Sequence, residues 1–116
     1  MNTVSSVNSK VLTIQEIADV VKPIAEKYGL QSMYLYGSYA RGTATAESDI
    51  DLIVDTTGSS IKGLFALGAL YSELEEALRK EIDLITLSSL TQEPQMQSEI
   101  GFRDNVQKEK ISLYAA

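Results

Sequence analysis

The stretch Met33-Tyr34-Leu35-Tyr36-Gly37-Ser38-Tyr39-Ala40-Arg41-Gly42, followed by Ser48-Asp49-Ile50-Asp51-Leu52, decides the fold. Its apolar and aromatic start, residues 33–37, is bounded by glycines and predicts a buried strand. Residues 38–41 can form one helical turn, and residues 50–54 predict a second strand that two carboxylates lead. This order of strand, short basic turn and carboxylate-led strand suits a site for a phosphate chain and its metal ions.

Helical patterns flank these strands. Thr13 and Glu16 have the spacing of a capping box and Gly29 is a stop signal, so we expect a helix from Ile14 to Tyr28, with a kink near Pro23. Residues 61–80 predict a second helix. Its expected apolar stripe comprises Leu64, Leu67, Tyr71, Leu74 and Leu78. Its expected solvent-exposed face and last turn comprise Glu73, Glu75, Glu76, Arg79 and Lys80.

The remaining segments complete a mixed pattern of helices and strands. Residues 82–87 predict a third strand, residues 95–108 a further helix, and residues 111–114 either a final strand or an ordered tail. Residues 56–60 and 88–94 have the composition of loops. The chain is therefore predicted to have an α/β (α+β) fold, a small mixed β-sheet with helices packed against it. The order of the strands does not follow from these patterns.

Composition narrows the class of protein. With 116 residues, 44% of them hydrophobic and 22% charged, we expect one soluble domain over residues 13–116, preceded by a flexible, polar N-terminus over residues 1–12. No apolar run approaches the ~20 residues that a membrane span needs. The N-terminal residues contain no apolar signal core, so we expect a cytoplasmic protein.

Two absences and the net charge limit the chemistry. The chain has no cysteine and no histidine, which excludes disulfides, thiolate zinc sites and histidine general bases. Carboxylates, hydroxyls, cations and hard metals bound by oxygen remain. The net charge of −6 argues against a large nucleic-acid interface and suits a basic protein partner.

Three aspartates are candidates for the chemistry. Alternation along a strand puts Asp49 and Asp51 on one face, where a cation would relieve their mutual repulsion. Asp55 also shares that face, and we assign it to the loop. Asp83 lies in an otherwise apolar strand. Each could simply be solvated at a strand end, but three carboxylates converge on a Mg²⁺ site if the two strands are neighbours.

Gly37 and Ser38 are candidates for holding phosphate. Glycine permits close approach of the backbone, and the Ser38 amide and hydroxyl begin a helical turn. Arg41, one turn later, could pair with phosphate or brace a carboxylate. The spacing of Gly58 and Gly63 matches a P-loop, but the required Lys and Ser or Thr do not follow.

In combination these motifs resemble a known signature. Gly37-Ser38, ten intervening residues and then Asp49-x-Asp51, with Asp83 on a later strand, resemble the DNA polymerase beta-like nucleotidyltransferases. In its short length and its motif Gly-Ser-Tyr-Ala-Arg-Gly, the chain is most similar to the minimal nucleotidyltransferases (MNT). These proteins are antitoxin partners of HEPN-domain ribonuclease toxins. The resemblance covers residues 33–87, and more weakly residues 102–114.

The resemblance implies roles for six residues. Asp49 and Asp51 would bridge two Mg²⁺ ions, and Asp83 would hold the ion that activates the attacking hydroxyl. Gly37 and Ser38 would cradle the outer phosphates of ATP, with assistance from Arg41. The implied product is AMP joined to a tyrosine of a HEPN toxin, which silences the toxin. Alternatives are an antitoxin that acts by contact alone, and a nucleotidyltransferase acting on a small molecule or an RNA end.

Overall fold

A computed structural model describes residues 11–88 and 109–116. In chain order its elements are α1 (Ile14–Tyr28), β1 (Ser32–Tyr36), α2 (Gly37–Arg41), β2 (Ile50–Asp55), α3 (Gly63–Leu78), β3 (Ile82–Thr86) and β4 (Ile111–Ala115). The α/β (α+β) fold class predicted from the sequence is confirmed. Residues 1–10 of the predicted flexible N-terminus, residues 89–94 of the second loop and the predicted helix over residues 95–108 lie outside the described residues.

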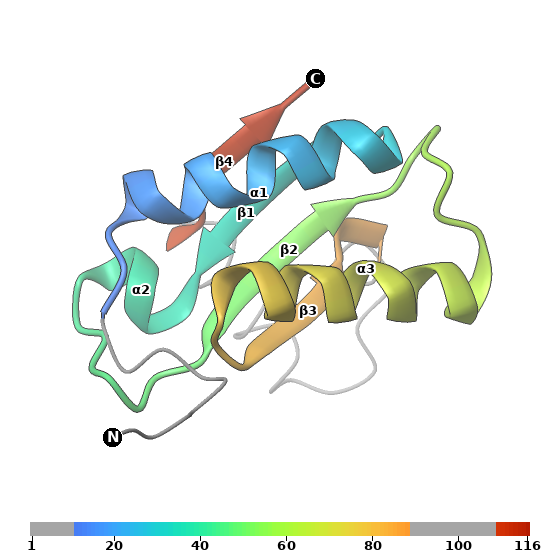
Figure 1. Cartoon of the computed structure of the whole chain (residues 1–116). Helices are drawn as coiled ribbons and strands as arrows, with labels where there is room; N and C mark the ends of the chain where they lie inside the picture. The colour runs from blue at the N-terminus through green and yellow to red at the C-terminus, as the bar shows by residue number, and fades with distance from the viewer. Residues whose placement is uncertain (1–10, 89–108) are drawn as a thin grey trace, which may run out of the picture.

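The four strands form one mixed sheet in the order β3-β2-β1-β4 (Figure 1). Strand β1 is antiparallel to both β2 and β4, whereas β2 and β3 are parallel. A parallel pair needs a long crossover connection, and α3 supplies it between β2 and β3. Residues 111–115 form a strand, β4, rather than an ordered tail, because they pair with the edge of β1 that β2 does not occupy.

Helices α1 and α3 cover one face of the sheet (Figure 1). The main core lies between them and the strands, and its largest fully buried side chains include Ile17, Met33, Leu52, Leu70 and Leu74. A second, smaller cluster comprises Tyr36 and Ile53, with Tyr34, Ile85 and Leu87 packed against them. Because side chains alternate along a strand, this cluster occupies the sheet face that α1 and α3 leave uncovered.

Helix α1 has the predicted bounds and the predicted cap. The Thr13 hydroxyl accepts from the Glu16 amide at 3.0 Å, and the Glu16 carboxylate accepts from the Thr13 amide at 2.8 Å. Gly29 ends the helix in the left-handed region, with φ of 70°. Pro23 lies inside the helix, and the kink near it stays a prediction.

Helix α3 differs from its prediction in length and in its buried face. It spans Gly63–Leu78, and its buried residues are Leu70, Leu74 and Leu78. Leu64 and Tyr71 of the predicted stripe are 85% and 37% exposed. Both Leu70 and Tyr71 fit helical spacing with Leu67 and Leu74, so only packing on the sheet could select Leu70.

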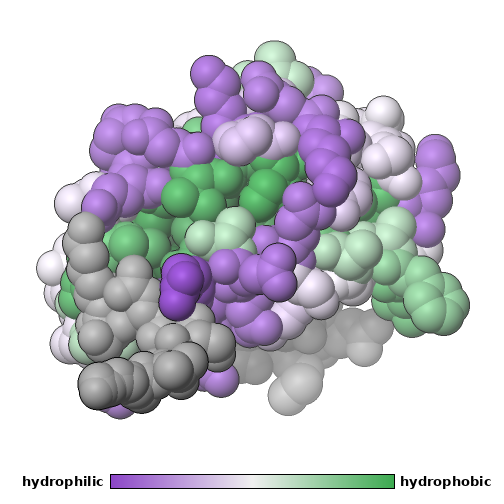
Figure 2. Space-filling model, viewed as in Figure 1, coloured by the Kyte–Doolittle hydropathy of each residue, from purple (hydrophilic) through white to green (hydrophobic). Residues whose placement is uncertain are grey.

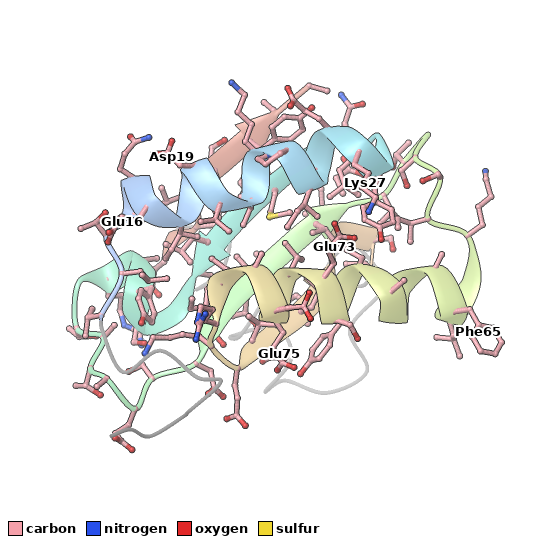
Figure 3. All side chains as sticks on the ribbon, in the orientation of Figure 1. Glu16, Asp19, Lys27, Phe65, Glu73 and Glu75 are labelled. Carbon is pink, nitrogen blue, oxygen red and sulfur yellow. The ribbon has the colours of Figure 1, made fainter. Side chains whose placement is uncertain are left out.

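The first turn of α3 exposes large apolar side chains. Phe65 is 98% exposed and points away from the rest of the molecule (Figure 3). Figure 2 shows an apolar surface at the same end of α3. Leu64 belongs to this exposed turn, which is why it cannot contribute to the core as the stripe predicted.

Two further predictions about polar residues are wrong. Lys80, predicted on the solvent-exposed face, is only 2% exposed. Asp55, predicted in the loop, is the last residue of β2, and its carboxylate accepts from the Thr57 amide at 3.0 Å. Among residues 11–88 and 109–116, no helix is long and apolar enough to cross a membrane.

Candidate nucleotidyl-transfer site

Three polar side chains form a row across the sheet face opposite α1 and α3. Tyr36 of β1 pairs with Asp51 of β2, and Asp51 pairs with Asp83 of β3. The Tyr36 hydroxyl donates to the Asp83 carboxylate at 3.4 Å. The strands that bear Asp51 and Asp83 are therefore neighbours in the sheet. Their register places the two residues directly opposite one another.

The environment of Asp51 disfavours its charged form. Burial raises the pKa of the Asp51 carboxyl to about 6, and the negative charges of Asp83 and Asp49 add to the rise. The positive charge of Arg41 acts in the opposite direction. A half-buried carboxylate among like charges is costly, and a bound cation removes that cost.

Asp49 stands apart from the row. It is exposed and immediately precedes β2, so it has no partner in the sheet ladder. Its charge nevertheless reaches Asp51, whose pKa it raises. In the part of the chain that the structure describes, no group of three or more acidic side chains is arranged to hold a metal ion. The structure pairs Asp51 with Asp83 across neighbouring strands, whereas Asp49 lies outside the sheet, immediately before β2.

Gly37 lies directly against Asp51. Its φ of 75° belongs to the left-handed region, and a Cβ built there would collide with the Asp51 carboxylate and stand 3.1 Å from its Cγ. Any other residue would therefore meet both backbone strain and a clash. The sequence predicts that the backbone at Gly37 approaches a ligand or turns tightly, and the group that lies against it in this structure is the carboxylate of Asp51.

Ser38 and Arg41 belong to α2, the short helix after Gly37. The N-cap residue Tyr36 makes no side-chain capping hydrogen bond in the described part of the chain, so it provides no side-chain acceptor for the amides of the first turn. Gly42 ends α2 with φ of 80°, and its amide donates to the Ser38 carbonyl. Arg41 forms an ion pair with Glu109 at 3.0 Å rather than with one of the three aspartates.

Sequence reasoning missed two residues near this site. The sequence predicts Tyr36 only as part of a buried strand, whereas its hydroxyl donates to Asp83. Its pKa is raised by burial and by the charges of Asp83 and Asp51. The sequence predicts Lys80 on the solvent-exposed face and last turn of a helix, whereas its Nζ donates to the Ala46 carbonyl at 3.1 Å in the loop before Asp49. No local signal marks either contact, because each depends on how distant strands and loops pair.

The donor set fits a hard divalent cation. Asp51 and Asp83 offer carboxylate oxygens side by side, and Gly37 leaves space against one of them. Oxygen ligands of this kind suit Mg²⁺, which retains water and accepts substrate phosphates as further ligands. The arrangement can hold a cation at the edge of the sheet face, next to the first amides of α2.

Comparison with known proteins agrees with this geometry. The model of the polymerase beta nucleotidyltransferase family matches residues 19–115. The protein adenylyltransferase MntA of Thermococcus cleftensis is 35% identical over 83 residues, which cover 68% of this chain and 82% of MntA.

Two solved structures have a similar fold. A toxin–antitoxin with AMP-PNP matches with a TM-score of 0.63 and 24% identity, over 85% of this chain and 73% of the other. The complex of the tri-AMPylated Shewanella oneidensis HEPN toxin with MNT antitoxin matches with a TM-score of 0.55 and 21% identity, over 90% of this chain and 74% of the other. The fold and the extent of the family match leave one assignment: the chain belongs to the polymerase beta nucleotidyltransferase family.

Proposed function

We propose that this protein is a cytoplasmic antitoxin that transfers AMP from ATP to a tyrosine hydroxyl of a HEPN-domain ribonuclease toxin. The hydroxyl oxygen bonds to the α-phosphorus of ATP, and the bond from that phosphorus to the bridging oxygen breaks. Pyrophosphate leaves and the hydroxyl proton passes to water. The modified tyrosine then silences the toxin.

The observation that carries this proposal is the alignment of Asp51 with Asp83 on neighbouring strands, with Gly37 packed against Asp51. Phosphate-holding residues and metal-binding residues must adjoin for transfer at the α-phosphate. Here the turn at Gly37 touches a candidate metal ligand, although the two are far apart in sequence. That contact supports one shared site for both functions.

The proposed roles follow the resemblance. Asp49, Asp51 and Asp83 would be the ligands of two Mg²⁺ ions. When bound, the ions supply Lewis-acid stabilisation of the attacking and leaving oxygens. Gly37 and Ser38 receive the outer phosphates of ATP through the backbone of α2. Arg41 assists after exchanging Glu109 for phosphate, since the Arg41–Glu109 pair is exposed and costs little to break.

The relatives support a protein acceptor. MntA of T. cleftensis is a protein adenylyltransferase, and the S. oneidensis MNT antitoxin occurs in complex with a tri-AMPylated HEPN toxin. The net charge of −6 also suits a protein partner with a basic surface, and it disfavours an RNA end as the acceptor.

The test uses this chain, Mg²⁺, α-labelled ATP and a HEPN-domain toxin as the candidate acceptor, taken from the product of the neighbouring gene. We expect label on the HEPN protein with the native chain and none with Asp49→Asn/Asp51→Asn. Asp55→Asn is the matched control, because Asp55 lies on the same strand at its far end. This control should transfer label at the native rate.

A toxicity assay separates enzymatic from steric neutralisation. On the enzymatic reading, the double variant still folds and binds the HEPN protein but no longer relieves its toxicity. If the double variant neutralises the toxin fully and leaves it unlabelled, the protein is an antitoxin that acts by contact alone.

A further inference from the structure

Lys80 is a buried lysine close to the proposed site. It follows Arg79, which ends α3 in the left-handed region with φ of 58°, and its side chain is almost fully enclosed. Its Nζ donates to the Ala46 carbonyl at 3.1 Å. No ion pair joins it to a carboxylate within residues 11–88 and 109–116. Burying an ammonium group is costly unless it is hydrogen-bonded. The hydrogen bond from Lys80 to the Ala46 carbonyl is therefore costly to lose, and it constrains the position of Ala46.

Ala46 belongs to a tight turn that leads into Asp49. The Ser48 amide donates to the Thr45 carbonyl at 3.0 Å, and the Thr45 amide donates to the Ser48 hydroxyl at 2.9 Å. The Glu47 amide donates to the Thr45 hydroxyl at 3.2 Å. These bonds make residues 45–48 one unit, so a tether at Ala46 holds the whole turn.

The far end of this turn is tied to the same segment as Lys80. The Ile50 amide donates to the Glu81 carbonyl at 3.1 Å, which begins the pairing of β2 with β3. The backbone of Asp49 therefore lies between two anchors, Lys80 through Ala46 and Glu81 through Ile50. Asp51 and Asp83 need no such support, because the sheet register places both.

We propose that Lys80 is a positioning residue that holds the turn of residues 45–48 and thereby fixes the backbone of Asp49 beside Asp51 and Asp83. The charge of Asp49 already reaches Asp51, whose pKa it raises, so a fixed backbone at Asp49 keeps the two carboxylates near one another. This inference rests on the proposed function, in which Asp49 is a metal ligand. Residues that orient metal ligands typically change metal affinity by about 10- to 100-fold when mutated.

The test measures Mn²⁺ binding to the metal-free chain by the electron paramagnetic resonance signal of free Mn²⁺. Lys80→Met keeps an apolar stem and removes the donor. We expect about 10- to 100-fold weaker Mn²⁺ binding, and faster hydrogen exchange at the amides of Thr45, Glu47 and Ser48. Exchange in α1 should not change. Lys22→Met, at an exposed lysine of α1, is the matched control and should leave both readouts unchanged.

Two more variants guard against misfolding of Lys80→Met. Lys80→Arg keeps a cationic donor and should restore much of the Mn²⁺ affinity. Ser48→Ala leaves Lys80 in place and loosens the turn by removing the acceptor of the Thr45 amide. It should also weaken Mn²⁺ binding. With saturating Mn²⁺, AMP transfer by Lys80→Met should return towards the native rate, because affinity rather than chemistry is lost.

The outcomes separate this inference from the proposed function. If Asp49→Asn weakens Mn²⁺ binding but folded Lys80→Met binds as tightly as the native chain, Lys80 has no positioning role. If Asp49→Asn leaves Mn²⁺ binding unchanged, Asp49 is not a metal ligand, and the positioning role of Lys80 falls with it while the labelling test still decides AMP transfer. If both variants lose Mn²⁺ but the native chain labels no protein, Lys80 keeps its role and the acceptor is wrong.

Discussion

At the residue scale, Gly37 is the position where backbone strain and steric contact coincide. Gly37 and Gly42 both have positive φ, 75° and 80°, but only Gly37 lies against a carboxylate. A Cβ at Gly42 would meet nothing within 4 Å. The two glycines therefore form a natural pair for separating the cost of strain from the cost of displacing Asp51.

We predict that Gly37→Ala lowers AMP transfer by on the order of 100-fold, the usual consequence of displacing a reacting group by about 1 Å. Gly42→Ala should cost about 1 to 2 kcal/mol of backbone strain, as Gly37→Ala does, yet retain most of the AMP-transfer activity. Urea unfolding and the rate of labelling measure the two effects separately. Equal loss of activity in both variants would show that strain alone matters.

The second residue-scale prediction concerns the charge of Asp51 without metal. Its pKa in the folded chain is raised to about 6 from 3.8, so between these values the folded state binds more protons than the unfolded state. The free energy of unfolding must then fall as pH rises from about 4 to about 6. With a chelator present, Asp51→Asn should remove this fall and raise the melting temperature at pH 7.5.

The control for Asp51→Asn is Asp55→Asn, because Asn can still accept from the Thr57 amide at that position. Its melting temperature at pH 7.5 should not rise. If Asp51→Asn melts below the native chain at pH 7.5 without metal, the Asp51 carboxylate stabilises the folded chain, which contradicts the prediction.

At the element scale, local signals specified α1 better than α3. The cap residues Thr13 and Glu16 and the stop at Gly29 all act within one turn of the helix, so they predicted the bounds of α1 correctly. Helix α3 has no side-chain hydrogen bond at its N-cap, Lys62. Its start and its buried face depend on the sheet beneath it.

A prediction for α1 follows from its cap. Thr13→Ala removes the hydroxyl that accepts from the Glu16 amide and should lower the free energy of unfolding by about 1 kcal/mol. Thr13→Ser keeps the acceptor and should recover most of this loss. Chemical denaturation gives both values, and AMP transfer should be unaffected at temperatures where each variant is folded.

The pairing of α1 with α3 also depends on tertiary contacts. Lys27 of α1 and Glu73 of α3 lie next to one another (Figure 3), and the Glu73 carboxylate accepts from the Lys27 ammonium at 3.0 Å. The same carboxylate accepts from the Tyr28 hydroxyl at 2.9 Å. These hydrogen bonds lower the pKa of Glu73, with the Lys27 bond the larger cause. Sequence patterns placed Glu73 on the exposed face, and its partners across the helix interface were not predictable from its own helix.

At the scale of the whole molecule, the proposed site exists only where α2, β2 and β3 meet (Figure 1). Ligand binding to this junction should therefore stabilise the entire chain. We predict that Mg²⁺ with ATP raises the free energy of unfolding by about 2.7 kcal/mol at a ligand concentration 100 times the dissociation constant. A thermal-shift titration measures this, and neither ATP with chelator nor Asp49→Asn/Asp51→Asn should show it.

By itself the sequence determined the features that arise from neighbours along the chain. These are the helix cap at Thr13, the break at Gly37, the alternation that separates Asp51 from the core, and the β-α-β order from β2 to β3. Each depends on spacing within a few residues, where the period of a helix or a strand constrains side-chain direction. The family resemblance rested on the same local spacings, and the family match confirms it.

Tertiary structure alone decided which distant groups meet. The register of β2 with β3 aligned Asp51 with Asp83, and the pairing of β1 with β2 put Tyr36 in the same row. Packing on the sheet selected Leu70 over Tyr71 and enclosed Lys80 against Ala46. The physical reason is that hydrophobic burial is non-directional, so a sequence pattern permits several alignments until the sheet and its core select one.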